Sequence, residues 1–318
     1  MTVPRPSANT TAQARGTLLG AALGDALGAR FEGEDVVGGP SLVAHDRAAE
    51  PLRYTDDTAQ TIVLARHLVQ RRDRAPVDED ALATDLARAW QAEPWRGYGA
   101  GSRQVLELVA AGVPWPEATR ACFGGHGSYG NGAAMRVAAL ALIATSLTHA
   151  AQLADRTAKV THAHQHGREG AELQACAVFL ALHSDPVRPL DRDHYLDELS
   201  RALPSTSWHG RIDQIRAMPP TASPSYAASL LGNDATAIRS VPMALHSFLR
   251  YPDHPAEAIR YAIRAGGDTD TIASMAGALA GARTGIHGLP VTWLERLENA
   301  DRIRALADRL APRIPRTR

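Results

Sequence analysis

Two stretches of small residues, GTLLGAALGDALG at residues 16–28 and GALAGARTG at residues 277–285, predict the centre of the fold. In each stretch glycine recurs at every fourth position, and residues four apart lie on one face of an α-helix. A glycine inside a helix costs about 1 kcal/mol relative to alanine, so a stripe of glycines needs a compensating contact. A face without side chains lets another backbone approach closely. We therefore expect both helices to be buried at the centre of a helical bundle.

The rest of the chain also carries helical patterning. From Ala12 onward apolar residues recur at helical spacing, and no segment has the alternation of β-branched residues typical of a strand. Helices are expected over residues 12–31, 57–72, 79–92, 101–111, 132–147, 149–163, 168–183, 191–202, 235–249, 255–265, 271–284 and 300–311. Loops rich in Gly, Pro, Ser or Asp are expected at residues 33–54, 94–100, 123–131, 184–190 and 217–226. No linker divides the chain, so we predict one all-α domain over residues 12–318 after a flexible arm at residues 1–11.

The composition excludes several classes of protein. The 318 residues include 34 Lys and Arg and 34 Asp and Glu, so a polybasic nucleic-acid binder is not indicated. Two isolated cysteines, Cys122 and Cys176, form no zinc or disulfide pattern and indicate a reducing compartment. The apolar run at residues 16–24 follows Arg5 and Arg15 as in a signal peptide, but glycines interrupt it, and no run reaches the roughly 20 residues of a membrane span. We expect a cytoplasmic monomer without a membrane anchor.

One acidic cluster, Tyr54-Thr55-Asp56-Asp57-Thr58, stands directly before an apolar-periodic helix. Helix capping explains one aspartate, because Asp57 as N-cap with Gln60 three residues later resembles a capping box. Capping does not explain two adjacent carboxylates with threonines on both sides.

A second acidic cluster, Gly266-Gly267-Asp268-Thr269-Asp270-Thr271, precedes the second glycine-striped helix. The Gly-Gly pair allows a sharp turn, and two aspartates at i and i+2 in an irregular segment can point both carboxylates at one centre. One of these aspartates could again act as a cap. The segment therefore repeats the features of the first cluster.

Together, the two clusters suggest one shared site for a hard cation. Carboxylates and hydroxyls suit Mg²⁺, Mn²⁺ or Ca²⁺, and the lack of Cys and His in the clusters disfavours zinc. Helix N-termini carry positive partial charge, so several carboxylates would be needed to hold a cation there. The spacing alone leaves cation binding and helix capping as equal alternatives.

Single acids and a run of histidines are harder to interpret. Glu32 ends the first glycine-striped helix, and Asp25 lies seven residues earlier on the same face, where an unpaired buried acid would be costly. His162, His164 and His166 alternate along a helical segment, which spreads them over different faces. We expect packed or surface histidines there and not a three-histidine metal site.

Two glycine-rich loops, GGHGSYGNG at residues 124–132 and RGYGAGS at residues 96–102, each precede an expected helix. Exposed backbone N–H groups near a helix N-terminus can cradle a phosphate. The loop at residues 124–132 matches neither the Walker A nor the dinucleotide fingerprint. For each loop a flexible connection remains the alternative.

These segments together resemble the ADP-ribosylglycohydrolase family, which includes dinitrogenase reductase-activating glycohydrolase and the ADP-ribosylarginine and ADP-ribosylserine hydrolases. The matching stretches are GTLLGAALGDALGARFEG (16–33), YTDDT (54–58), GSYGNGAAMR (127–136), TH (161–162) and GGDTDTIASMAGALAGA (266–282), in the family's order. The resemblance implies an all-α orthogonal helical bundle with a dinuclear magnesium or manganese centre in a central cleft. In departure from the family, Ser102 stands where many members carry Thr, and the loop at residues 33–54 has no clear counterpart.

The resemblance also implies roles for individual residues. The expected ligands of the two Mg²⁺ (or Mn²⁺) ions are Thr55, Asp56, Asp57, Asp268, Asp270 and Thr271, with Asp270 as the bridge. Glu32 matches a glutamate that gates the cleft in the serine-type hydrolases. Substrate contacts are implied for Gly127 and for Ser128, Tyr129, Gly130 and Asn131, which match a loop that holds the diphosphate and ribose. His162 matches a histidine that lines the cleft, and Tyr98 and Gly99 match more loosely a loop near the adenosine.

The implied activity is metal-dependent hydrolysis of the glycosidic bond at C1″ of ADP-ribose. It would release ADP-ribose from a modified serine or arginine side chain of a protein or from a small ADP-ribosyl conjugate. A carboxylate would take the proton of the attacking water, and Asp268 and Glu32 are the two candidates. The loop at residues 127–136 looks closer to the serine-type members. The alternatives are an ADP-ribose-binding or structural member of the fold without turnover, and a metal-dependent hydrolase of another substrate.

Overall fold

The computed structural model describes residues 8–71, 75–203 and 206–315. Within these ranges there is no β-strand, and only two isolated bridges join Leu52 to Leu297 and Gly130 to Thr236. The all-α fold class predicted from the sequence is therefore confirmed. None of the helices in the described ranges is long and apolar enough to cross a membrane.

The helices follow one another with short connections. In chain order they are α1 (Ala8–Gly28), α2 (Gly39–Arg47), α3 (Asp56–Gln70), α4 (Glu79–Ala92), α5 (Ala100–Ala110), α6 (Trp115–Ala121), α7 (Ala138–Ala141), α8 (Leu147–Lys159), α9 (Gln165–His183), α10 (Arg192–Ala202), α11 (Thr206–Arg216), α12 (Pro224–Leu231), α13 (Ala237–Arg250), α14 (Pro255–Arg264), α15 (Thr269–Thr284), α16 (Val291–Arg296) and α17 (Ala300–Leu310). Short 3₁₀ helices are η1 (Ala29–Phe31), η2 (Cys122–Gly125), η3 (Ile286–Gly288) and η4 (Ala311–Arg313).

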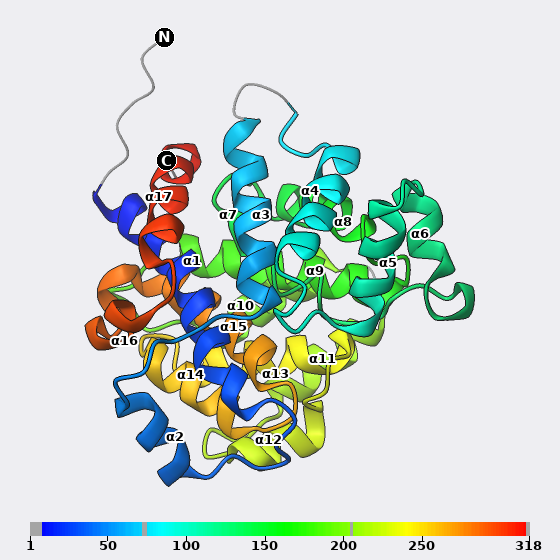
Figure 1. Ribbon diagram of the computed structural model, residues 1–318. Helices are drawn as coiled ribbons and strands as arrows, with labels where there is room; N and C mark the ends of the chain where they lie inside the picture. Colours follow the sequence, from blue (N-terminus) through cyan, green and yellow to red (C-terminus); the bar gives the residue numbers. More distant parts are fainter. Residues whose placement is uncertain (1–7, 72–74, 204–205, 316–318) are drawn as a thin grey trace.

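Helices α1 and α15 lie side by side through the centre of the molecule (Figure 1). A Cβ added at Gly20 would lie 2.3 Å from the carbonyl oxygen of Gly277, and one at Gly281 would lie 2.0 Å from that of Gly16. Non-bonded carbon atoms need about 3.5 Å or more, so no side chain fits between the two backbones. The close approach predicted from the glycine stripes is confirmed.

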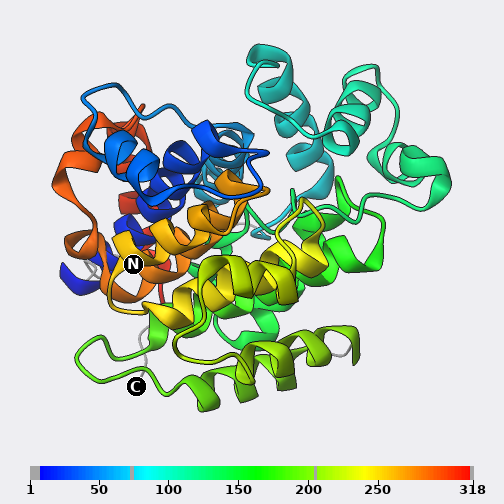
Figure 2. The ribbon, with the colours of Figure 1, turned by 90° about the horizontal axis from the view of Figure 1, so that it is seen from below.

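The remaining helices pack around this central pair. Helices α9, α13 and α14 contact α15, whereas α17 contacts α1. Helices α4, α5 and α6 gather at one end of the molecule (Figure 2). The dispersion attraction between the closely packed backbones of the central pair offsets the cost of its glycines. The ends of α1 and α15 thereby become fixed points for the segments that follow or precede them.

Most of the predicted helices occur within a few residues of their expected bounds, and α1 starts at Ala8, before the expected Ala12. Residues 1–7 of the predicted arm lie outside the described ranges. The sequence did not predict α2, α6, α11, α12 and α16. Four of these have nine residues or fewer, too few to establish a helical period. Helix α11 does carry the period, because Trp208, Ile212 and Ile215 are all buried.

The helix predicted at residues 132–147 is wrong over most of its length, since only Ala138–Ala141 is α-helical. Every residue from 133 to 144 is buried. The amide N–H groups of Leu140 and Ile143 bond to carbonyl oxygens three residues earlier, as in consecutive tight turns. Packing on all sides thus overrode the helix propensity of an alanine-rich segment.

Replacing Gly20 with alanine should destabilise the protein by at least about 2 kcal/mol, because the added methyl group overpacks a backbone contact that cannot relax. Gly210 is the matched control: it is helical and exposed, with nothing within 4 Å of an added Cβ. Gly210→Ala should be neutral or stabilising by up to about 1 kcal/mol. The free energy of unfolding in denaturant measures both effects, and equal values for the two variants would contradict the backbone contact.

Candidate active site

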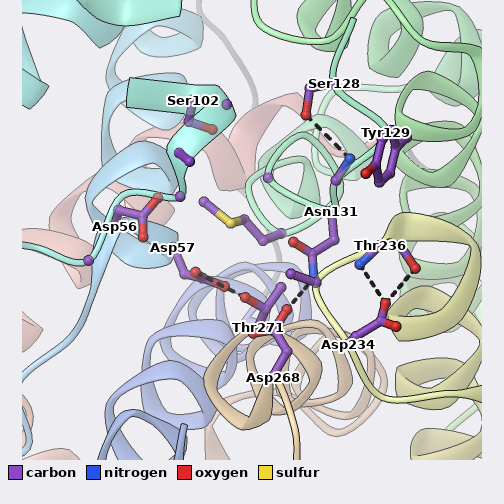
Figure 3. Close-up of a pocket in the computed structure, with 18 of the residues that line it drawn as sticks. Asp56, Asp57, Ser102, Ser128, Tyr129, Asn131, Asp234, Thr236, Asp268 and Thr271 are labelled. Atoms are coloured by element: carbon purple, nitrogen blue, oxygen red, sulfur yellow. Dashed lines mark hydrogen bonds between the residues drawn. The ribbon is translucent and has the colours of Figure 1, made fainter. Parts of the chain in front are cut away.

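A cavity of about 380 Å³ opens where seven segments of the chain meet. Its walls come from Glu32 after η1, the starts of α3, α5 and α15, the glycine-rich loop before α7, the turn between α8 and α9 and the loop before α13. Figure 3 shows Asp56 and Asp57 on one side of it, with Asp268 and Thr271 close by and Asn131 reaching toward Asp268. The volume is within the usual range of ligand pockets.

The first acidic cluster is fixed by Asp25, a fully buried residue of α1. Its carboxylate accepts hydrogen bonds from the backbone N–H groups of Thr55 and Thr58, both at 2.9 Å, and from the Thr58 hydroxyl at 2.5 Å. These bonds satisfy the buried acid and hold the start of α3 against α1. The N-cap of α3 is Thr55, whereas the sequence had offered Asp57 as a cap. Both Asp56 and Asp57 are therefore left for another role.

The second acidic cluster follows a turn at Gly266 and Gly267, both of which have φ of +73°. An added Cβ at Gly267 would lie 2.2 Å from the carbonyl oxygen of Asn233, so this position requires glycine for space as well as for conformation. Past the turn, the Asp268 carboxylate accepts a 2.6 Å hydrogen bond from the Asn131 amide. Asn131 in turn donates to the Ser240 hydroxyl at 3.0 Å, which fixes its orientation.

The two clusters face each other. The Thr271 hydroxyl lies 3.4 Å from Oδ2 of Asp57, and the Thr55 hydroxyl lies at the same distance from that oxygen. Carboxylate oxygens of Glu32, Asp268 and Asp270 lie within 4.8 Å of one another. The ends of α1, α3 and α15 thus bring five acidic side chains to one place.

Burial and mutual repulsion make these acids hard to ionise together. Burial and the neighbouring Asp270 raise the pKa of Asp57 well above its usual value, and burial and Asp268 do the same for the pKa of Asp270. Burial and Asp25 raise the pKa of Asp56 to about 7. Burial followed by the charge of Asp268 raises the pKa of Glu32.

The acidic cluster fits a divalent cation on grounds of its own structure. Oδ1 of Asp57 is buried and has no hydrogen-bond partner among the described residues. A buried acceptor without a donor costs free energy that a bound cation would offset. The donors present are carboxylate and hydroxyl oxygens, as Mg²⁺ and Mn²⁺ prefer. The residues that would hold such ions are Thr55, Asp56, Asp57, Asp268, Asp270 and Thr271.

Most of the residues predicted to form the site line the cavity. They are Glu32, Asp56, Asp57, Gly99, Ser128, Tyr129, Gly130, Asn131, His162, Asp268, Asp270 and Thr271. Tyr98, predicted as a substrate contact, is buried outside the cavity wall, and its hydroxyl has no partner among the described residues. Gly127, also predicted as a contact, packs instead against the Ala163 side chain. Thr55 lies behind the wall as the N-cap of α3.

Sequence reasoning missed several wall residues. Phe123 has a left-handed backbone with φ of +50°, and its ring centre lies 5.5 Å from that of Tyr129 at the cavity. Asp234 and Thr236 precede α13 and bond to each other at 2.6 Å. The Asp-Ala-Thr pattern before a helix resembles the other two clusters and could have been noticed, whereas nothing in the sequence singles out Phe123.

The sequence matches the family model described as ADP-ribosylglycohydrolase over residues 6–318. The chain belongs to the ADP-ribosylglycohydrolase family. It is 34% identical to the mouse (Mus musculus) protein named ADP-ribosylhydrolase ARH3, an alignment that covers 96% of this chain and 92% of that protein. It is 27% identical to the Pseudomonas putida ADP-ribosylarginine hydrolase Tri1, over 95% of this chain and 79% of that protein.

A solved structure described as an ADP-ribosylglycohydrolase-related protein complex shares the fold. Its TM-score is 0.74 at 27% sequence identity, with 96% of this chain and 99% of that chain covered. As a member of the ADP-ribosylglycohydrolase family, the chain is placed among hydrolases of ADP-ribosyl groups, and the family resemblance expected from its motifs is confirmed.

Without cations, the raised pKa of Asp56 should make the protein less stable as pH rises from about 4 to about 8. In this range the folded state holds a proton that the unfolded state has released, so stability falls by up to 1.4 kcal/mol per pH unit for each such group. Asp56→Asn removes the group, and the difference in unfolding free energy between parent and variant should therefore change with pH. A difference between parent and Asp56→Asn that stays constant from pH 4 to pH 8 would contradict the prediction.

Adding Mg²⁺ or Mn²⁺ to chelator-treated protein should raise the melting temperature, because a cation bound only by the folded state stabilises it by about 2.7 kcal/mol at a hundred times its Kd. Asp57→Asn should abolish this shift, since it removes the buried orphan carboxylate. Asp301→Asn should retain it. A full shift in Asp57→Asn, measured by calorimetry, would count against cation binding at this cavity.

Proposed function

We propose that the protein hydrolyses the glycosidic bond at C1″ of serine-linked ADP-ribose, with two divalent cations as cofactors and an ADP-ribosylated protein as substrate. The main support is the meeting of two Asp/Thr clusters and two glycine-rich segments around one cavity. The acidic floor of the cavity, formed by Glu32, Asp56, Asp57, Asp268 and Asp270, suits cations and the ribose hydroxyls that cations bind. Glycine-rich walls suit the diphosphate.

The diphosphate site is proposed at the start of α5, which differs from the family resemblance, where the loop at residues 128–131 holds the diphosphate and Gly99 lies near the adenosine. This helix has no side-chain hydrogen bond at its N-cap, Gly99, and residues 99–102 line the cavity. The unpaired N–H groups and positive partial charge of a helix N-terminus bind phosphate groups. Next to the start of α5, where a Cβ added at Gly101 would lie 2.7 Å from the Phe123 ring, the rings of Phe123 and Tyr129 offer a stacking surface for adenine.

The bond to be broken would lie over the acidic floor. Bound cations would orient the ribose hydroxyls and stabilise negative charge that develops on oxygen in the transition state. Glu32 is the proposed base that takes the proton of the attacking water. Asp268 already accepts a hydrogen bond from the Asn131 amide. The Glu32 carboxylate is exposed, and its raised pKa lies closer to neutral pH, as suits a general base.

The serine linkage is proposed from two comparisons. The loop at residues 127–136 looks closer to serine-type members of the family. The identity to the mouse protein named ARH3 is 34%, against 27% to the P. putida ADP-ribosylarginine hydrolase. The arginine linkage is the alternative that an assay must separate.

The test measures release of free ADP-ribose from serine-linked and arginine-linked peptides, with Mg²⁺ and with chelator. We expect metal-dependent turnover on the serine peptide. Glu32→Gln should lower kcat by roughly 10²–10⁴-fold, which is the usual contribution of general base catalysis. It should keep the melting shift with Mg²⁺, because the other carboxylates remain.

Asp301→Asn serves as the matched control and should retain full activity. Turnover of the arginine peptide alone would reverse the linkage. No release from either peptide, together with tight binding of ADP-ribose, would indicate a binding protein in place of an enzyme.

A further inference from the structure

A fully buried arginine lies between the acidic floor and the histidine in the cavity wall. Arg136 is 0% exposed and belongs to the irregular segment that follows the glycine-rich loop. It forms no ion pair within 4 Å of a carboxylate among the described residues, and its hydrogen bonds run only to neutral groups. Burying a guanidinium without a carboxylate partner is costly, so the position needs a reason beyond packing.

One arm of Arg136 leads to Asp56. Its NH1 group donates to the Gln60 side-chain oxygen at 2.8 Å, and the Gln60 amide donates to Oδ2 of Asp56 at 2.7 Å. Gln60 is fully buried, so its amide has no competing water. The guanidinium fixes which end of Gln60 faces Asp56, because it can bond only to the oxygen.

The other arm leads to His162. The NH2 group of Arg136 donates to the Thr161 hydroxyl and to the Thr157 carbonyl, both at 2.8 Å. The Thr161 hydroxyl lies 2.8 Å from Nδ1 of His162, which is nearer than the 3.5 Å to its other acceptor, the Ala158 carbonyl. The hydroxyl accepts from the guanidinium and is left with one proton to donate.

That proton decides the form of the imidazole ring. If Thr161 donates to Nδ1, the neutral ring carries its own proton on Nε2. Nε2 lies on the side of Gly130 and Gly132, in the cavity wall, and has no partner among the described residues. Burial, with a smaller effect of Arg136, lowers the pKa of His162 to about 3, so the ring stays neutral.

We propose that Arg136 is a positioning residue that orients both sides of the cavity at once. Through Gln60 it holds the Asp56 carboxylate, and through Thr161 it holds His162 as the Nε2–H tautomer, a hydrogen-bond donor toward the ligand. The identity of that ligand as an ADP-ribosyl group rests on the proposed function, whereas the orientation of the two side chains does not.

The hydrogen-bond chains from Arg136 to Asp56 and from Arg136 to His162 can be interrupted separately. Thr161→Val removes the hydroxyl and should shift His162 away from the pure Nε2–H tautomer, as read from the ¹⁵N signals of its ring nitrogens in cation-free, ligand-free protein. Its affinity for free ADP-ribose should fall roughly tenfold, the loss of one hydrogen bond to a charged group. Gln60→Met should leave the ¹⁵N signals unchanged and lower Mn²⁺ affinity about 10-fold to 100-fold, as for other residues that orient metal ligands.

Thr157→Val is the matched control, because Thr157, in α8 four residues before Thr161, is equally buried and its hydroxyl bonds only to the Ala154 carbonyl. It should change neither readout. His162→Gln identifies the His162 signals, and Arg136→Lys, which keeps the charge without the two-armed geometry, should change both readouts together.

Three results would overturn the proposal: a protonated Nδ1 in the parent protein, unchanged ¹⁵N signals in Thr161→Val, or equal changes in Thr157→Val and Thr161→Val. If Arg136→Lys does not fold, the two single-arm variants still decide the outcome. The ¹⁵N measurement needs no turnover. If the protein shows the expected ¹⁵N signals but does not bind ADP-ribose, the proposed function is refuted and the positioning role of Arg136 is retained.

Discussion

The backbone contact between α1 and α15 is the constraint on which the rest of the structure depends. It continues to the edge of the cavity, because a Cβ added at Gly28 would lie 2.6 Å from Cα of Asp270. The distance between the end of α1, which leads into Glu32, and the start of α15, which carries Asp270, is therefore set by two helices that cannot separate. The site depends on the rigidity of the core more than on its loops.

Charge is balanced unevenly in this molecule. The chain is neutral overall, yet five acids from three helix ends share one small volume. Asp25 is satisfied by four hydrogen bonds to the start of α3, and Asp268 by Asn131. Oδ1 of Asp57, by contrast, is buried and has no hydrogen-bond partner among the described residues. This crowding is the reason why the pKa values of Asp57 and Asp270 are raised, and a cation paired with these carboxylates would offset their mutual repulsion.

The sequence predicted the central pair and the acidic clusters because both follow from spacing: a four-residue glycine period, and carboxylates directly before a helix. The prediction failed where a segment is buried on all sides, because apolar residues then occur at every position and show no period. Residues 133–144 are buried on all sides and fold as turns, although their composition favours a helix. Phe123 reaches the cavity only through a left-handed backbone. The positions of Tyr98 and Gly127 behind the wall depend on side-chain packing, which no motif encodes.

The segment after Glu32 is tied to the second acidic cluster through its backbone. The Gly33 N–H bonds to the Gly267 carbonyl, and the Gly267 N–H bonds to the Glu34 carbonyl. A change in chain length between Glu32 and Asp35 would therefore displace residues on both sides of the cavity together. From Gly38 onward the chain leaves this pairing and forms α2 on the outside of α14. The fold can thus accept insertions and new surface features there while the arrangement of acids stays the same.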